Sequence, residues 1–180
     1  MNVLISPRLT LRPPAPPDAE DIALWLSDRN VARMLARVPH PYHVEDAEEW
    51  IDRVAADPDA MVYTIHRERL IGVVLLEGDP AAPALGYWLA APWHGRGYMT
   101  EAAHALLSHA FSTRGIATVA SSVFADNPAS LRVQRKLGFC ITGAGETFAH
   151  GRNASVQTLT TRLTAAAFAG RECQETRSAA

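Results

Sequence analysis

The chain has 180 residues, a length that fits one domain and permits a sizeable hydrophobic core. Hydrophobic residues make up 48% and charged residues 20% of the sequence, which is typical of a globular protein and excludes a disordered one. With 17 Lys and Arg against 19 Asp and Glu, the net charge is -2. Because nucleic acid and anionic membranes are held by concentrated positive charge, we expect neither as a partner.

The sequence carries no pattern for export, membrane insertion or metal binding. No apolar run approaches the roughly 20 residues of a membrane helix, and residues 1–7 lack the pattern of an export signal. Cys140 and Cys173 have neither metal-ligand spacing nor a disulfide framework. The apolar run around Cys140 predicts a buried thiol. We therefore expect a cytoplasmic protein without a metal.

Apolar spacing and turn residues predict helices and strands along most of the chain. The first half predicts a strand at Leu9–Arg12, a helix at 16–26, a short helix capped by Asn30 and ending at Leu35, a helix at 44–56, and a hairpin of 61–65 with 70–76. The second half predicts a strand at 85–89, a helix at 100–111, a strand at 118–124, a helix at 128–137, and strands at 139–141 and 156–163. This order is typical of a mixed α/β fold with a mostly antiparallel sheet and at least one parallel crossover. We expect one domain over residues 1–164 and a frayed or disordered tail over residues 165–180.

A glycine-rich turn stands between the expected strand at 85–89 and the expected helix at 100–111. Gly95 and Gly97 permit a tight turn with exposed backbone N–H groups, and the helix N-terminus that follows adds its positive dipole end. Such a junction is suited to phosphate, although two glycines also serve where only a tight connection is needed. The turn is neither a P-loop, because it contains no lysine, nor a dinucleotide fingerprint, because Thr100 stands in place of the third glycine.

Several motifs in this order resemble those of one known family. Residues His94–Met99 resemble the pyrophosphate-binding turn of the Gcn5-related N-acetyltransferase (GNAT) superfamily. A narrower resemblance, to the ribosomal-protein-alanine acetyltransferase branch, is carried by Leu9–Arg12, Leu85–Leu89, Gly95–Ala102, Asn127–Ser130 and Lys136–Phe139. The similarity runs from about residue 6 to residue 164.

The resemblance implies a GNAT-type fold, in which a mixed, mostly antiparallel sheet opens into a V between its fourth and fifth strands, here 85–89 and 118–124. Acetyl-CoA would lie in that V as the co-substrate. It would be held by the backbone of Leu89 and Ala90 and the side chain of Asn127 at its pantetheine arm, with Ser130 near the thiol. The pyrophosphate would lie on the turn formed by His94, Gly95, Arg96, Gly97, Tyr98, Met99 and Thr100.

Three positions depart from the family pattern. His94 stands where Gln or Arg is usual. Met99 stands where a small residue is usual, and we expect it to add bulk near the phosphates. Ala84 stands where the branch often carries a glutamate, so one candidate for activating the amine is missing.

The implied reaction is direct attack of a primary amine on acetyl-CoA in a ternary complex, with a protein N-terminus or a small molecule as the acceptor. Ser130 is the candidate proton donor to the departing thiolate, and Glu146 is the candidate base, with His150 as an alternative base. An α-amine has a pKa of about 8 against about 10.4 for a lysine side chain, so a weak base suffices for the first class. The sequence is compatible with a monomer or a homodimer.

Two other functions remain open at this point. The missing carboxylate at Ala84 is compatible with a catalytically silent module that binds acyl-CoA. The Gly95–Gly97 turn is compatible with an unrelated enzyme that binds a nucleotide. Release of free coenzyme A in the presence of amines distinguishes the first alternative. Competition by coenzyme A, but not by ATP or NAD, distinguishes the second.

Overall fold

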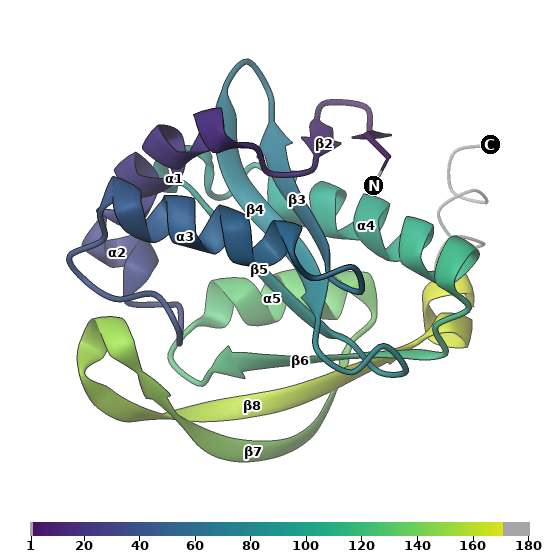
Figure 1. Ribbon diagram of the computed structural model, residues 1–180. Coiled ribbons are helices and arrows are strands. Elements are labelled where there is room, and N and C mark those ends of the chain that lie inside the picture. Colours follow the sequence, from purple (N-terminus) through teal and green to yellow (C-terminus); the bar gives the residue numbers. More distant parts are fainter. Residues whose placement is uncertain (1, 171–180) are drawn as a thin grey trace.

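The computed structural model describes residues 2–170 of the chain. Within these residues the centre is an eight-stranded sheet with the order β1-β2-β3-β4-β5-β6-β8-β7 (Figure 1). The strands are β1 Leu4–Ile5, β2 Thr10–Arg12, β3 Met61–His66, β4 Leu70–Glu77, β5 Ala84–Leu89, β6 Thr118–Phe124, β7 Cys140–Ala149 and β8 Ala154–Thr164. β5 and β6 run parallel, while the other neighbouring strands run antiparallel. The predicted mixed α/β fold with a mostly antiparallel sheet is confirmed.

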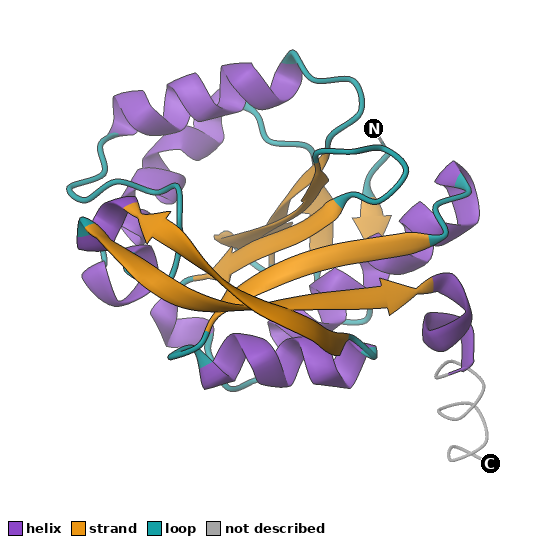
Figure 2. Cartoon of the chain, turned by 90° about the horizontal axis from the view of Figure 1, so that it is seen from below, coloured by secondary structure: helices purple, strands orange, loops and turns teal. Residues whose placement is uncertain are grey.

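Helices cover both faces of this sheet (Figure 2). The α-helices are α1 Ala19–Leu26, α2 Arg29–Ala32, α3 Val44–Ala55, α4 Tyr98–Arg114 and α5 Pro128–Leu137, and the short 3-10 turns are η1 Pro16–Asp18, η2 Ala91–Trp93 and η3 His150–Arg152. α4 packs on one face, where Leu106 and Leu107 join the larger hydrophobic core. α1 and α3 pack on the other face, where Ile22 and Ile51 belong to a smaller core. β5 and β6 are therefore connected by a crossover through α4.

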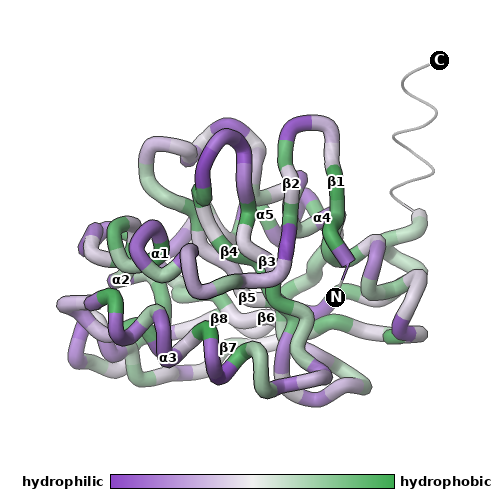
Figure 3. Tube along the Cα trace, turned by 45° about the horizontal axis from the view of Figure 1, so that its top comes forward, coloured by the Kyte–Doolittle hydropathy of each residue, from purple (hydrophilic) through white to green (hydrophobic). Residues whose placement is uncertain are grey.

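Burial explains the sequence patterns of the central elements. β3 and β4 are buried on both faces, and their sequences are accordingly almost continuous apolar runs. α3 packs with one side only, so hydrophilic and hydrophobic residues alternate along its trace (Figure 3). The predicted hairpin of β3 and β4 is present, and its strands extend the expected ranges by one residue each.

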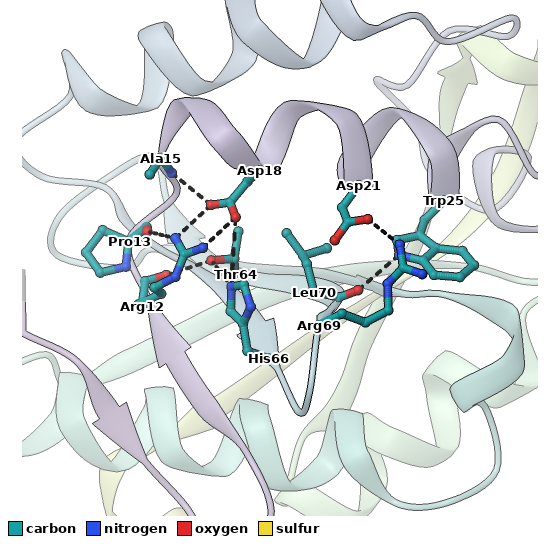
Figure 4. Close-up of polar contacts among 10 residues, drawn as sticks. All are labelled: Arg12, Pro13, Ala15, Asp18, Asp21, Trp25, Thr64, His66, Arg69 and Leu70. Atoms are coloured by element: carbon teal, nitrogen blue, oxygen red, sulfur yellow. Dashed lines mark hydrogen bonds and ion pairs between the residues drawn. The ribbon is translucent and has the colours of Figure 1, made fainter.

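Polar contacts fix both ends of α1 on the sheet (Figure 4). Arg12 on β2 donates hydrogen bonds of 2.8 and 2.6 Å to the two carboxylate oxygens of Asp18, whose side chain is 5% exposed. At the other end, the Trp25 indole donates a 3.0 Å hydrogen bond to the carbonyl of Leu70 on β4. Between them, Arg69 and Asp21 form an ion pair that is more exposed to solvent.

Two local expectations are wrong. α2 is capped by Asp28, whose carboxylate accepts a 2.8 Å hydrogen bond from the Asn30 backbone N–H, and the helix ends at Ala32. An Asp side chain serves as an N-cap as well as Asn does, and it stands two residues earlier. The thiol of Cys140 is exposed, because this residue opens β7, the outermost strand of the sheet.

The other differences concern where elements begin and end. β7 continues to Ala149, and α4 spans Tyr98–Arg114 rather than 100–111. Residues 165–170, expected to be frayed, are helical, because Phe168 is 4% exposed and packs in the larger core. The remainder of the expected tail, with Cys173, lies outside the described residues. None of the helices in residues 2–170 has both the length and the apolar composition that a membrane span requires.

Candidate active site

The sheet opens between β5 and β6. Within the described chain these strands share only two registered pairs, Ala84 with Ala120 and Leu85 with Ser121. Beyond Leu85, β5 continues beside β4, whereas β6 continues beside β8. The sheet therefore forms a V with its apex at these two pairs, one arm containing β1–β5 and the other containing β6, β8 and β7. The predicted opening between these strands is confirmed.

A buried polar network holds the apex together. The Ser121 hydroxyl donates a 2.8 Å hydrogen bond to the carbonyl of Leu85 and accepts one of 2.8 Å from the Gln134 amide. The Thr161 hydroxyl donates to the Gln134 amide oxygen at 2.8 Å. Gln134 is 1% exposed, and both ends of its amide are paired, as buried polar groups require. Side chains from β6, α5 and β8 thus fix the point at which the two arms diverge.

Tyr87 and Ser130 meet inside the V. The Tyr87 hydroxyl lies 2.8 Å from the Ser130 hydroxyl and donates to the Ser130 carbonyl at 3.1 Å. Burial raises the pKa of Tyr87 to about 12, against the lowering effect of hydrogen bonds with Ser130 and Gln134. The phenol therefore stays protonated at neutral pH and is a hydrogen-bond donor. The Ser130 hydroxyl contacts β5 rather than pointing into solvent.

Asn127 caps α5 next to this pair. Its side-chain oxygen accepts a 3.0 Å hydrogen bond from the Ser130 backbone N–H. The side-chain oxygen of Asn127 is therefore used by the helix, and its Nδ2 group is the part of the side chain to which a ligand in the V can bind.

The glycine turn leads from β5 into α4. Gly95 and Gly97 have φ of 75° and 80°, in the left-handed region that favours glycine. Gly97 caps α4 with no side-chain cap from the described residues, so the first N–H groups of the helix point outward without intrahelical partners. Tyr98 and Met99 are 5% and 6% exposed and pack in the core. The expectation that Met99 adds bulk near the phosphates is therefore wrong.

Three guanidinium groups surround this turn, and two of them come from distant parts of the sequence. Arg8 is held by a 2.6 Å ion pair with Glu101 and donates a 3.1 Å hydrogen bond to the carbonyl of Arg96. The guanidinium carbons of Arg67 and Arg96 lie 5.7 and 5.8 Å from the ring centroid of Trp93. Sequence analysis missed Arg8 and Arg67, because only the folded chain brings them to the turn. Because Glu101 neutralises Arg8, the positive charge that the turn offers to an anion comes from Arg67 and Arg96.

Part of the backbone expected to hold the pantetheine arm is already paired. The His94 ring lies with Nε2 2.7 Å from the Leu89 carbonyl oxygen. The Ala90 N–H donates a 2.8 Å hydrogen bond to the carbonyl of Ile71. His94 thus turns back to the end of β5, where it shapes the turn, instead of extending toward a ligand.

The structure places Glu146 away from β5, and it places His150 in η3 against the segment that follows α2. Glu146 is exposed on β7 and lies opposite Gln157 of β8, whose amide donates to it at 3.3 Å. β8 and β6 separate it from β5. His150 belongs to η3, where its backbone N–H donates to the carbonyl of Ala36 at 2.9 Å. The role of either residue as a base stays a prediction.

Comparison with known proteins agrees with this geometry. The family model described as "Acetyltransferase (GNAT) domain" matches residues 8–140. A curated relative, "Probable N-acetyltransferase YjcK" of Bacillus subtilis (strain 168), is 32% identical over 82 residues. This match covers 43% of the chain and 45% of the relative, so it spans less than half the length of that protein.

Solved structures of acetyltransferases share the fold. An acetyltransferase (GNAT family) from Bacillus anthracis has a TM-score of 0.79 at 19% identity, covering 91% of this chain and 98% of its own. RimL, a ribosomal L7/L12 alpha-N-protein acetyltransferase in complex with coenzyme A, has a TM-score of 0.80 at 20% identity, covering 91% and 98%. MccE, the microcin C7 self immunity acetyltransferase in complex with acetyl-CoA and AMP, has a TM-score of 0.76 at 22% identity, covering 88% and 93%.

Proposed function

Because the chain belongs to the GNAT acetyltransferase family, we propose that it transfers the acetyl group of acetyl-CoA to a primary amine by direct attack in a ternary complex. The observation that carries this proposal is the V between β5 and β6, which holds the Tyr87–Ser130 pair and leads at the end of β5 into the glycine turn. The V thus combines a pair of hydroxyl groups, a turn at the N-terminus of α4, and an edge of β5 that pairs with β6 only at Ala84 and Leu85 in the described chain.

The cofactor would bind along β5. The pyrophosphate would accept hydrogen bonds from the backbone N–H groups of Gly95 to Thr100, with the helix dipole of α4 and the guanidinium of Arg96 adding positive charge. The pantetheine arm would lie in the V as an added strand, with Asn127 Nδ2 as a side-chain donor. The acetyl group would then lie close to Tyr87 and Ser130, in the part of the V near the apex.

The amine nitrogen attacks the thioester carbonyl carbon, a C–N bond forms, and the C–S bond breaks. The departing thiolate must gain a proton, and the new ammonium nitrogen must lose one to water or to a base. The Ser130 hydroxyl, hydrogen-bonded to the protonated Tyr87 phenol, gives its own proton to the sulfur and regains one from water, which takes up the proton released by the ammonium nitrogen. The products are an N-acetylated amine and free coenzyme A.

The acceptor that fits best is an amine already partly neutral near pH 7, such as a protein N-terminus or a small α-amine. The carboxylate candidate Glu146 lies on the outermost strand, away from β5, which favours an acceptor that needs little help to lose its proton. An α-amine is neutral about 100-fold more often than a lysine side chain.

The test is an assay of coenzyme A thiol release from acetyl-CoA with a panel of amines and short peptides, with the acetylated product identified by mass spectrometry. The proposal expects release with at least one α-amine. Binding of acetyl-CoA without release on any acceptor would instead identify a silent acyl-CoA-binding module. Displacement of bound acetyl-CoA by ATP or NAD would contradict both.

A further inference from the structure

Glu77 lies beside the apex of the V. It ends β4 and stands directly opposite Ala84 of β5, and Ala84 pairs in turn with Ala120 of β6. Directly opposed residues of an antiparallel pair project to the same face of the sheet. The Glu77 carboxylate, whose side chain is 28% exposed, therefore lies one strand from the apex, on the face of Ala84.

This face is the open side of the V. Near the apex this face carries the small residues Ala84, Gly86 and Ser122, of which Ala84 and Ser122 are exposed. Trp88, farther along β5 on the same face, packs against the core formed by α1 and α3. The opposite face is occupied at the same level by Tyr87 and by α5, which carries Ser130. An acceptor can therefore approach an acetyl group in the V from the side on which Glu77 lies.

Arg37 pairs with Glu77 from a segment that bridges the two arms of the V. This segment, residues 33–38, leads from α2 toward α3 (Figure 1). On one arm, Arg152 of η3 donates a 2.5 Å hydrogen bond to the Arg33 carbonyl. On the other arm, the Arg37 guanidinium forms an ion pair with Glu77. The segment thus carries a cation to a carboxylate on the open face.

We propose that Glu77 binds the ammonium group of the acceptor and that Arg37 occupies this carboxylate until an acceptor displaces it. The proposal rests on the proposed function, because it requires the acetyl group to lie in the V. The Arg37 side chain is 75% exposed, so the pair is well screened by solvent and exchanges readily. The acceptor class is a primary amine that arrives as a cation, gives its proton to water, and then attacks as the neutral amine.

The alternative is a structural latch, in which the ion pair only joins the segment 33–38 to β4. An ion pair with only this structural role is lost when either partner is removed. Arg37→Gln and Glu77→Gln would then change KM in the same direction. The proposal expects opposite directions. Removing Arg37 frees the carboxylate and lowers KM for a cationic acceptor, whereas removing Glu77 raises it.

The experiment measures KM and kcat of both variants with a tripeptide amide, Ala-Ala-Ala amide, as the cationic acceptor. We expect KM to rise about 10-fold in Glu77→Gln, the size of one charge-assisted hydrogen bond. In Arg37→Gln we expect it to fall by about 3-fold, the size of one exposed ion pair. With phenylhydrazine, an acceptor that is uncharged at neutral pH, both variants should resemble the unmodified protein.

A matched control removes another exposed ion pair. Arg69→Gln and Asp21→Asn break the pair that joins the β3–β4 turn to α1, and both should leave KM unchanged. Shifts of KM in the same direction for Arg37→Gln and Glu77→Gln, or equal shifts for phenylhydrazine, would overturn the role of Glu77. If the unmodified protein turns over no acceptor, the proposed function fails. The Glu77 proposal is then tested by titrating the peptide amide into the complex with coenzyme A. It expects Kd for the peptide amide to rise in Glu77→Gln and to fall in Arg37→Gln.

Discussion

The Tyr87 and Ser130 hydroxyl groups lie 2.8 Å apart, so a phenol from β5 and an alcohol from α5 meet at one point of the β5–β6 opening. The contact links β5, which would border the cofactor, to α5, which lies beside the other arm. Because burial raises the pKa of Tyr87 to about 12, its proton is held throughout the physiological range. The pair can therefore work as one proton-donating unit.

We expect Tyr87→Phe and Ser130→Ala each to lower kcat by about 10- to 100-fold, at or just below the usual span of general acid–base assistance. The affinity for acetyl-CoA should change little in either variant. The double variant should be only slightly slower than each single one, because groups that act as a unit are not additive. Steady-state kinetics with calorimetric titration measure both quantities. An intact kcat with a weakened affinity would show that the pair is only a binding contact.

Gly97→Val should weaken acetyl-CoA binding by about 10-fold or more without unfolding the domain, a loss of roughly 1.4 kcal/mol. Its φ of 80° is strained for valine, and the new side chain would stand where the pyrophosphate approaches the backbone. Gly115→Val is the matched control, since Gly115 has φ of +62° at the other end of α4 with no described atom within 4 Å of an added Cβ. Calorimetry should find a weaker affinity only in Gly97→Val. Equal affinities for acetyl-CoA in the two folded variants would show that the phosphates do not bind at this turn.

Activity should rise with pH up to the pKa of the acceptor amine, because the neutral amine is the nucleophile. Tyr87 does not limit this rise, since a phenol with a pKa of about 12 loses no proton below about pH 10. Glu146→Gln should lower activity only modestly, and α-amines should react faster than lysine side chains. A pH–rate profile settles the point. A bell-shaped profile with an enzyme base near about pH 6.5 that disappears in Glu146→Gln would contradict it.

Arg12→Leu should destabilise the protein by about 3 kcal/mol, because it leaves the Asp18 carboxylate buried without its partner. Asp18 is 4% exposed, while Arg12 is 35% exposed at its side chain. Arg69→Leu removes the more exposed pair with Asp21 and should cost about 1 kcal/mol or less. Urea denaturation of both variants gives the comparison. Equal losses would show that the burial of Asp18 does not set the cost.

The sequence predicts most of this fold because most elements carry their own pattern. α5 has the predicted bounds of residues 128–137, since Pro128 starts it and Gly138, with φ of 101°, ends it. β7 was predicted only as far as Ile141, because Gly143 and Gly145 interrupt any strand pattern. Its extension to Ala149 depends on pairing with β8, which no local pattern records.

The parts of the candidate site that lie within one short sequence motif could be predicted. The contacts between residues that are distant in the sequence could not. The left-handed glycines of the turn could be inferred from Gly95 and Gly97 themselves. The partnership of Tyr87 with Ser130 could not, because the two residues are 43 positions apart and meet only through the V. Met99 is a third case, since it lies in the first turn of α4, next to the glycine turn, and its side chain packs in the core.

The two arms of the sheet share only two registered residue pairs within the described chain, which leaves the β5 and β6 edges short of partners over the rest of their length. A cofactor bound there, as proposed, would contact both edges and would have no equivalent site on the unfolded chain. Mass action then adds about 2.7 kcal/mol to the folded state when the free cofactor is at 100 times its Kd. The supply of acetyl-CoA would therefore set how long each molecule survives proteolysis, in addition to how fast it works.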